Sequence, residues 1–98
     1  MLFAVHCLDK PDHLALRLAS YEAHKAYLAT APLAAVVSGP LLADDGRTMI
    51  GSLFIVEAAC RDDVVAFNAA DPFSQAGVWA QVQIHPFLMR VDNRSRRL

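Results

Sequence analysis

The sequence is poor in charged residues, in glycine and in cysteine. Charged side chains make up 19% of the 98 residues, against ~25% in typical soluble domains. The formal net charge is −1 and the isoelectric point is about 6.4, which lacks the basic excess of nucleic-acid-binding domains. With two cysteines and four glycines, the chain has the composition of neither a disulfide scaffold nor a low-complexity segment.

A run of apolar residues long enough to span a membrane is also missing. A spanning helix needs ~20 mostly apolar residues in succession. The uncharged stretch at residues 26–43 contains Pro32, Gly39 and Pro40, which break a helix. The apolar start of the chain lacks the basic region of a signal peptide. We therefore expect a soluble cytoplasmic protein with no membrane or nucleic-acid partner.

The sequence contains no phosphate-binding loop, dinucleotide fingerprint or nucleophile elbow. No group of His, Cys and carboxylate residues has the spacing of a zinc site. We accordingly expect neither a metal nor an organic cofactor, and free thiols at the two cysteines. The C-terminal arginines are interpreted as a solvated end without a role: Arg90, Arg94, Arg96 and Arg97.

Apolar residues, in contrast, are abundant. The set AVILMFWYC supplies 55% of the chain, above the ~45–50% apolar content of typical soluble domains. The length predicts one domain over residues 1–98. Because a small domain buries a limited fraction of its surface, the surplus is expected in an oligomer interface or a ligand pocket.

The order of secondary structure predicts the fold. Residues 1–8 are an apolar run of strand length. Residues 13–31 are rich in Ala and Leu without Gly or Pro, which favours a helix with Asp12 as its N-cap. Further strands are expected at 34–42, 49–59 and 78–89, a second helix at 61–70, and one more helical turn at 72–76. This order predicts a ferredoxin-like α+β fold, a four-stranded antiparallel sheet with two helices on one face.

The predicted strands are apolar on both faces. In the first strand Phe3 and Val5 point one way, and Leu2 and Ala4 point the other way. Strands of this kind are buried on both faces, although two helices cover only one face of such a sheet. We therefore expect a homodimer whose sheets pack face to face, forming a dimeric α/β barrel with twofold symmetry.

Four residues of the first predicted helix share one stripe. Helical spacing places Arg17, Tyr21, His24 and Leu28 on the same side. A cation, a phenol and an imidazole together suggest a functional site in a helix otherwise rich in Ala and Leu. The alternative is a polar helix edge that faces solvent.

Two further features are candidates for this site. Asp71 precedes Pro72 at the end of the second helix, where an aspartate often does no more than close a helix. It could instead accept a hydrogen bond from His24, since the two helices lie side by side in this fold. Gly39 and Pro40 mark a bend in the second strand, which could admit a ligand or be a simple kink.

Taken in order, the residues of the chain resemble the YciI-like (YCII-related) family. The matching positions cover nearly the whole chain: Asp9-Lys10-Pro11-Asp12, Arg17, His24 with Leu28, Gly39-Pro40, Gly51-Ser52, Phe54-Ile55-Val56-Glu57, Ala70-Asp71-Pro72-Phe73, Ala76-Gly77-Val78 and Pro86-Phe87. The resemblance implies a dimeric α/β barrel and a histidine–aspartate pair, which falls on His24 and Asp71. One branch of the family dehydrochlorinates a chlorinated hydroxyquinol. Relatives often have arginine in place of Tyr21, so this chain is expected to take a different ligand.

These observations lead to a principal hypothesis of a lyase or isomerase that acts on a small aromatic or anionic compound. Asp71 would accept the Nδ1–H of His24, which leaves Nε2 to exchange a proton with the substrate. Arg17 and Tyr21 would hold an anionic or phenolic oxygen. Further substrate contacts are expected from Gly39, Pro40 and Ser52.

Two other functions stay open at this level. The pocket could bind a small organic anion without any chemistry. Alternatively, the protein could be a purely structural dimer in which His24 and Asp71 tie two helices together.

Overall fold

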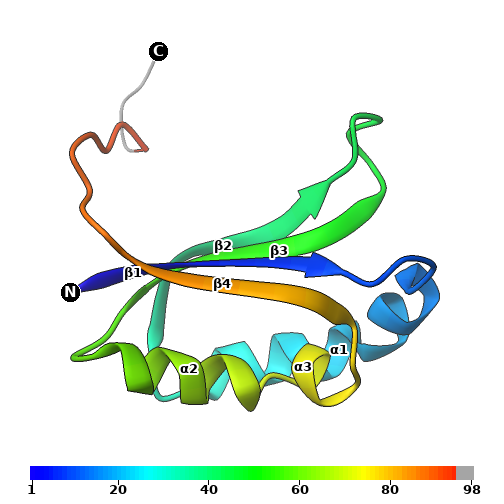
Figure 1. The fold of residues 1–98 in the computed structure, drawn as a ribbon, viewed down its shortest axis with the longest axis horizontal. Helices are drawn as coiled ribbons and strands as arrows, with labels where there is room; N and C mark the ends of the chain where they lie inside the picture. The colour runs from blue at the N-terminus through cyan, green and yellow to red at the C-terminus, as the bar shows by residue number, and fades with distance from the viewer. Residues whose placement is uncertain (95–98) are drawn as a thin grey trace.

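The computed structural model describes residues 1–94 as one antiparallel sheet with helices on a single face (Figure 1). The sheet has the strand order β2-β3-β1-β4, and every neighbouring pair is antiparallel. Its strands are β1 (Leu2–Asp9), β2 (Ala34–Leu42), β3 (Met49–Glu57) and β4 (Trp79–Phe87). The helices are α1 (Leu14–Thr30), α2 (Arg61–Ala69) and the short α3 (Pro72–Gln75). The predicted ferredoxin-like α+β fold is confirmed, and Arg96 and Arg97 lie outside the described residues.

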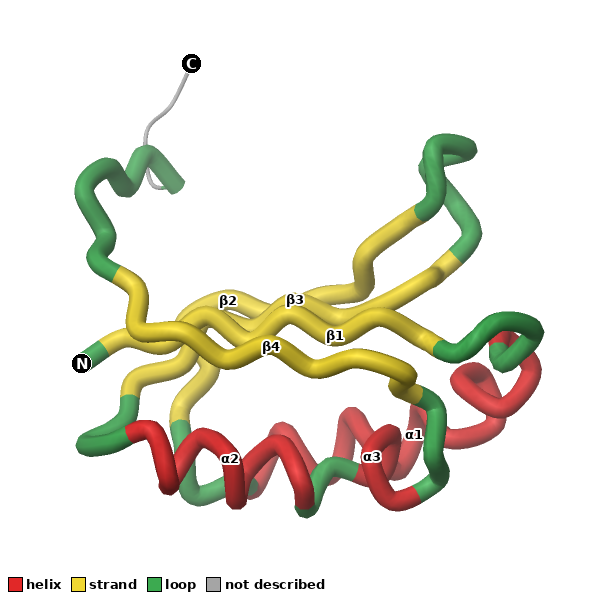
Figure 2. The backbone as a smooth tube through the Cα atoms, viewed as in Figure 1, coloured by secondary structure: helices red, strands yellow, loops and turns green. Residues whose placement is uncertain are grey.

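The two long helices run side by side beneath the sheet (Figure 2). The hydroxyl of Tyr27 in α1 donates to the backbone carbonyl of Phe67 in α2, over 2.7 Å. None of the helices in residues 1–94 is both long and apolar enough to cross a membrane. The strand predicted at 34–42 has those bounds, whereas the strands predicted at 49–59 and 78–89 are shorter by two or three residues.

The predicted N-cap of α1 is wrong. His13 occupies the N-cap position, and no side chain caps the helix. Asp12 lies one residue earlier with a φ of 60°, the left-handed conformation that aspartate tolerates better than most residues. The chain therefore uses Asp12 to reverse direction between β1 and α1 rather than to start the helix.

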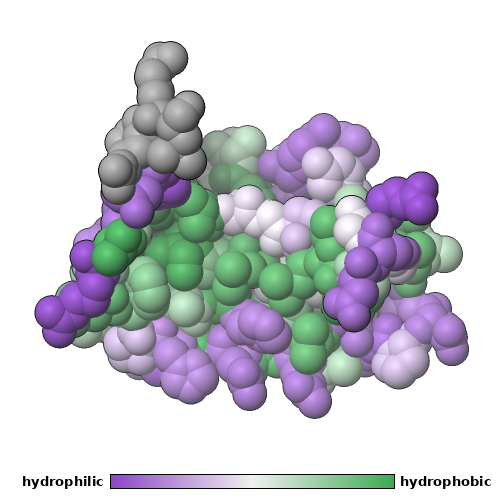
Figure 3. Space-filling view, turned by 90° about the horizontal axis from the view of Figure 1, so that it is seen from above, coloured by the Kyte–Doolittle hydropathy of each residue, from purple (hydrophilic) through white to green (hydrophobic). Residues whose placement is uncertain are grey.

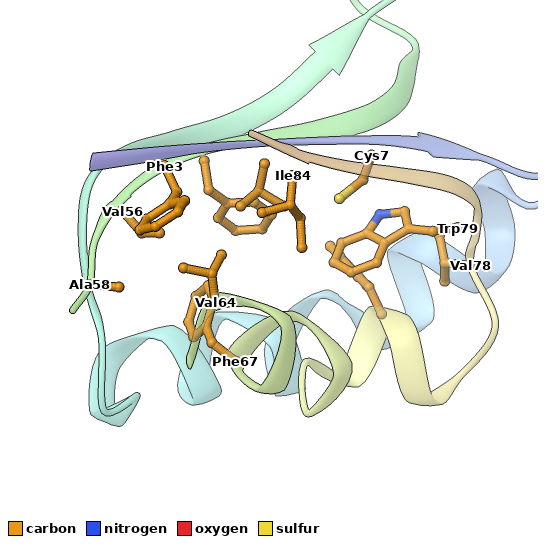
Figure 4. Packing of buried hydrophobic residues seen from close by; sticks show 12 residues of the cluster. Phe3, Cys7, Val56, Ala58, Val64, Phe67, Val78, Trp79 and Ile84 are labelled. Carbon is orange, nitrogen blue, oxygen red and sulfur yellow. The ribbon is translucent and has the colours of Figure 1, made fainter. Parts of the chain in front are cut away.

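The apolar core lies between the sheet and the helices (Figure 4). Its buried residues in the described chain are Phe3, Val5, Cys7, Phe54, Val56, Ala58, Val64, Phe67, Phe73, Val78, Trp79 and Ile84. None of them comes from α1 or β2. The buried residues of α1 are instead Arg17 and His24, so the α1–β2 side of the molecule is left for a polar site.

The thiol of Cys7 belongs to this core. Burial raises its pKa to about 12, so the group stays protonated at neutral pH and is a poor nucleophile. The amide of Asn68 donates to its sulfur over 3.7 Å. Cys60 is exposed, and both thiols are free, as expected from the sequence.

The other face of the sheet is not covered by helices. Ala4 pairs with Ile55 and His6 pairs with Leu53 on this face, and all four side chains are only half-buried. Figure 3 looks down on it and shows an apolar centre flanked by polar residues. Phe3 and Val5 point to the helices, as the alternation predicts.

Close strand contact at Gly51 gives a first testable prediction. A Cβ atom at this position would collide with the backbone oxygen of Cys7 and lie 3.1 Å from the side chain of Leu41. Gly51→Ala is therefore expected to lower the free energy of unfolding by about 1–3 kcal/mol, the usual cost of overpacking, as measured by urea denaturation. Gly39→Ala is the matched control, because no atom lies within 4 Å of the place that its new methyl group would take. An equal loss in both variants would contradict this explanation.

Candidate functional site

A pocket of about 270 Å³ lies between α1, α3 and the helix-facing side of β2 and β3. It lies beside the apolar core, since Phe54 and Phe73 belong to both. The residues that line it are Arg17, Tyr21, His24, Lys25, Leu28, Ser38, Gly39, Pro40, Met49, Ser52, Phe54 and Phe73. All five residues expected to contact a substrate are among them, together with His24.

His24 and Asp71 are joined by a buried hydrogen bond. Nδ1 of His24 lies 2.9 Å from Oδ1 and 2.8 Å from Oδ2 of Asp71. The side chains are 10% and 1% exposed. Because a carboxylate can only accept hydrogen bonds, Nδ1 is the ring nitrogen that donates.

The same carboxylate also starts α3. Asp71 is the N-cap of this helix, and its Oδ1 accepts a hydrogen bond of 2.8 Å from the backbone N–H of Phe73. Pro72 follows at the first helical position, where proline is favoured. The cap fixes the carboxylate, and the fixed carboxylate in turn orients the imidazole.

Phe73 contacts the two buried ionisable side chains of α1, Arg17 and His24. Its ring is stacked on His24 at a centroid distance of 4.0 Å and a tilt of 14°. The guanidinium carbon of Arg17 lies 4.5 Å from the same centroid. Arg17 and His24 are seven residues apart, and seven residues of helix rise by ~10 Å. This distance leaves room for one phenyl ring between the two side chains. Phe73 is therefore inserted between Arg17 and His24.

Arg17 is engaged by two buried partners. Its Nε donates to Oδ2 of Asp9 over 2.7 Å, and its Nη2 donates to Oδ1 of Asp9 over 3.0 Å. Nη2 also lies 2.6 Å from Oγ of Ser52. Arg17 is 2% exposed and His24 is 8% exposed, so for these two residues the interpretation of a solvent-facing helix edge is wrong.

The mouth of the pocket carries an exposed cation. Nζ of Lys25 lies 5.3 Å from the centre of the Tyr21 ring, and Tyr21 is 42% exposed. Glu22 approaches the same ammonium group at 3.3 Å. Tyr21 thus lies on the rim of the pocket. At this position the helix has the solvent-facing polar edge of the alternative interpretation.

Sequence reasoning misses several residues of the site, among them Asp9, Phe73 and Lys25. The pattern presents Asp9 as the end of a strand, and both Asp9 and Phe73 as parts of a family motif, and it does not single out Lys25. Of the remaining histidines, His13 binds the backbone oxygen of Pro11 at 2.7 Å. His13 and the remaining two, His6 and His85, do not line the pocket. Within residues 1–94, no three His, Cys, Asp or Glu residues are grouped closely enough to share a metal ion.

Comparison with known proteins assigns the chain to a family. The YCII-related domain matches residues 1–88. The chain belongs to this family. Protein YciI of Escherichia coli O6:H1 and that of Shigella flexneri are each 33% identical to it over 98 residues, covering 89% of this chain and 96% of the relative.

A solved structure of this YCII-related type is similar over most of the chain. It is 5-chloro-2-hydroxyhydroquinone dehydrochlorinase (TftG) from Burkholderia phenoliruptrix AC1100, in complex with 2,5-dihydroxybenzoquinone. The match has a TM-score of 0.79 and 36% identity, and covers 90% of this chain and 94% of the other. An antibiotic biosynthesis monooxygenase matches with a TM-score of 0.54 and 16% identity over 91% of this chain and 100% of its own, which shows a shared fold.

Proposed function

We propose that this YCII-related protein is a lyase or isomerase that uses His24 and Asp71 to transfer a proton on a small hydroxylated ring compound. The observation that carries the proposal is the buried hydrogen bond to Asp71 from Nδ1 of His24, a residue that lines the pocket. Similarity to a dehydrochlorinase with a bound dihydroxybenzoquinone supports the same reaction class.

The hydrogen bond to Asp71 assigns a role to each nitrogen of His24. Since Nδ1 donates to the carboxylate, the neutral ring presents Nε2 as a proton acceptor. When Nε2 takes a proton, the neighbouring carboxylate stabilises the imidazolium that forms. His24 can therefore act as a general base and return the proton as a general acid.

Dehydrochlorination makes use of this chemistry. The substrate loses HCl overall: one hydroxyl proton moves to the ring carbon that carries chlorine, and chloride then leaves with the electron pair of the C–Cl bond as a second hydroxyl group gives up its proton. A histidine can carry out the proton transfers of this reaction, at a ring carbon or at a ring oxygen. The atoms and electrons balance without an oxidant or a reductant.

The size and lining of the pocket suit a single ring. Its volume of about 270 Å³ lies just below the ~300–1,000 Å³ of pockets for drug-sized ligands. Phe54, Phe73 and Leu28 supply apolar walls. Lys25 at the rim offers a positive charge to a phenolate or another organic anion.

The proposal is tested by chloride release from 5-chloro-2-hydroxyhydroquinone, measured by ion chromatography. His24→Asn keeps an N–H that can donate to Asp71 but removes the imidazole ring. We expect wild-type turnover to fall by at least about 100-fold in this variant, the lower range for general acid–base catalysis. His13→Asn is the matched control, because His13 lies outside the pocket and bonds the backbone oxygen of Pro11, and it is expected to keep full activity.

Other outcomes separate the two alternative functions. If 2,5-dihydroxybenzoquinone raises the Tm of the wild-type protein but no chloride appears, the pocket binds a ligand without dehydrochlorinating this substrate. A third outcome is that neither effect occurs and that His24→Ala lowers the free energy of unfolding by ~1–3 kcal/mol, the cost of leaving a buried hydrogen-bond partner unpaired. The pair is then structural.

We propose in addition that the protein is a homodimer joined through the open face of the sheet. The half-buried apolar side chains of Leu53 and Ile55 on this face would pack against the second copy. Sedimentation equilibrium at micromolar concentration is expected to give a dimer. Leu53→Glu is expected to give a monomer, because it places a charge in the interface. Val65→Glu on the exposed side of α2 is the control and should stay dimeric; a monomeric wild-type protein would contradict the proposal.

A further inference from the structure

The contact with Arg17 determines that the hydroxyl oxygen of Ser52 accepts a hydrogen bond. A guanidinium group has donors and no acceptor, so Oγ of Ser52 accepts in the 2.6 Å contact with Nη2 of Arg17. The hydroxyl proton must then point elsewhere. Among residues 1–94, the contacts of the Ser52 side chain show it only as an acceptor. Ser52 is 3% exposed and lines the pocket, where a ligand oxygen can accept that proton.

Arg17, in contrast, has two of its three guanidinium nitrogens engaged by protein side chains. Asp9 engages both its Nε and its Nη2, and Phe73 covers one face of its guanidinium group. The charge of Arg17 is balanced by a carboxylate whose side chain is 8% exposed. A charged donor on Oγ polarises the Ser52 hydroxyl and strengthens it as a donor, because hydrogen bonds in a chain reinforce one another.

We infer that Ser52 donates a hydrogen bond to an oxygen of the ligand and that Arg17 is a positioning residue that acts through Ser52. This role rests on the proposed function and specifies its substrate class. Nε2 of His24 accepts a proton and Ser52 donates a hydrogen bond, so the ligand must offer one acidic O–H or C–H group and one carbonyl or phenolate oxygen. Hydroxyquinones, polyhydroxylated phenols and enolised dicarbonyl compounds have this pattern.

The two groups divide one proton transfer between them. When the acidic O–H or C–H bond of the ligand breaks, the proton moves to Nε2 of His24. The electron pair of that bond passes into the conjugated ligand and places negative charge on its oxygen. The Ser52 hydroxyl stabilises that charge, as donors aimed at a developing oxyanion do in other enzymes. The reverse transfer regenerates His24, and no co-reactant is needed.

The first arm of the test measures binding of 2,5-dihydroxybenzoquinone by titration, following the visible absorption of the bound compound. Ser52→Ala is expected to weaken binding by roughly 10- to 100-fold, the equivalent of one hydrogen bond to a charged acceptor. It is also expected to shift the absorption band of the bound compound, because the donor to its oxygen is lost. Ser52→Thr keeps the hydroxyl and is expected to retain most of the wild-type affinity and a nearly wild-type absorption band.

The second arm tests whether Arg17 acts through Ser52. Arg17→Lys keeps the positive charge beside Asp9 but cannot form the forked contact to both Asp9 and Ser52. We expect it to weaken binding at least 5-fold when Ser52 is present and by less than 2-fold in the Ser52→Ala background. Circular dichroism confirms that each variant is folded.

The outcomes distinguish this inference from the proposed function. Equal effects of Arg17→Lys in both backgrounds would show that Arg17 contacts the ligand directly. Unchanged binding and absorption in Ser52→Ala would remove Ser52 from the site, while chloride release that depends on His24 would still support the proposed function. A wild-type protein that neither binds the quinone nor releases chloride would overturn both.

Discussion

Asp71→Asn is expected to lower turnover by about 10²–10⁴-fold while the protein stays folded. An asparagine has one acceptor oxygen, and the N–H of Phe73 already occupies the Oδ1 position at 2.8 Å. The amide NH₂ would then replace Oδ2, which lies 2.8 Å from Nδ1 of His24. A donor at that position forces the ring proton onto Nε2 and removes the base from the pocket.

The measurement that checks this mechanism combines chloride release with ¹⁵N NMR of the His24 ring. The NMR shifts are expected to show Nε2 protonated in Asp71→Asn and Nδ1 protonated in the neutral wild-type ring. Asp71→Ala is the comparison variant, because it also removes the N-cap of α3, which is worth ~1 kcal/mol. Full activity in Asp71→Asn would show that the tautomer of His24 plays no part in turnover.

Asp9→Ala is expected to have the largest effect on stability. Asp9 and Arg17 have side chains that are 8% and 3% exposed. Removing one partner of a buried ion pair leaves a charge without compensation and costs ~3–5 kcal/mol, a large share of the ~5–15 kcal/mol that stabilises a typical domain. The Tm of a domain of this size should fall by at least about 12 °C.

Two controls test whether that loss comes from the charge of Arg17, which Asp9→Ala leaves unpaired. Glu22→Ala breaks the contact between Glu22 and Lys25. Because these two side chains are 81% and 58% exposed, the variant is expected to leave the Tm unchanged. The double variant Asp9→Leu, Arg17→Met replaces the pair by apolar side chains and should recover most of the stability. If the double variant is no more stable than Asp9→Ala, the loss comes from the changed shape at Asp9 rather than from the charge of Arg17.

The sequence predicts the fold well because periodicity and chain breaks mark its elements. The alternation of β1 predicts that Phe3 and Val5 share one face, and both are buried. The pairing of His24 with Asp71 is also within reach of the sequence. A polar stripe on one helix and an acid at the end of its neighbour are brought together once the two helices share one face of the sheet.

The remaining parts of the site depend on geometry that has no sequence signature. Asp9 reaches Arg17 because the turn before α1 contains the left-handed Asp12, whereas the pattern of the sequence predicts a cap there. Phe73 lies between Arg17 and His24 only after α3 has packed beside α1. Contacts between residues this far apart follow from the assembled fold and not from any local spacing.

The placement of the pocket residues separates reactivity from selectivity. The groups proposed to move a proton, His24 and Asp71, belong to α1 and to the start of α3. The opposite wall is formed by strand residues, among them Ser38, Pro40 and Met49, and in residues 1–94 these three form no hydrogen bond with the pair. Mutations in that wall can reshape the ligand site without disturbing the acid–base pair. Residues that select the ligand can therefore vary in β2 and at Met49, while Ser52 of β3 and the pair from α1 and α3 keep the proposed proton transfer.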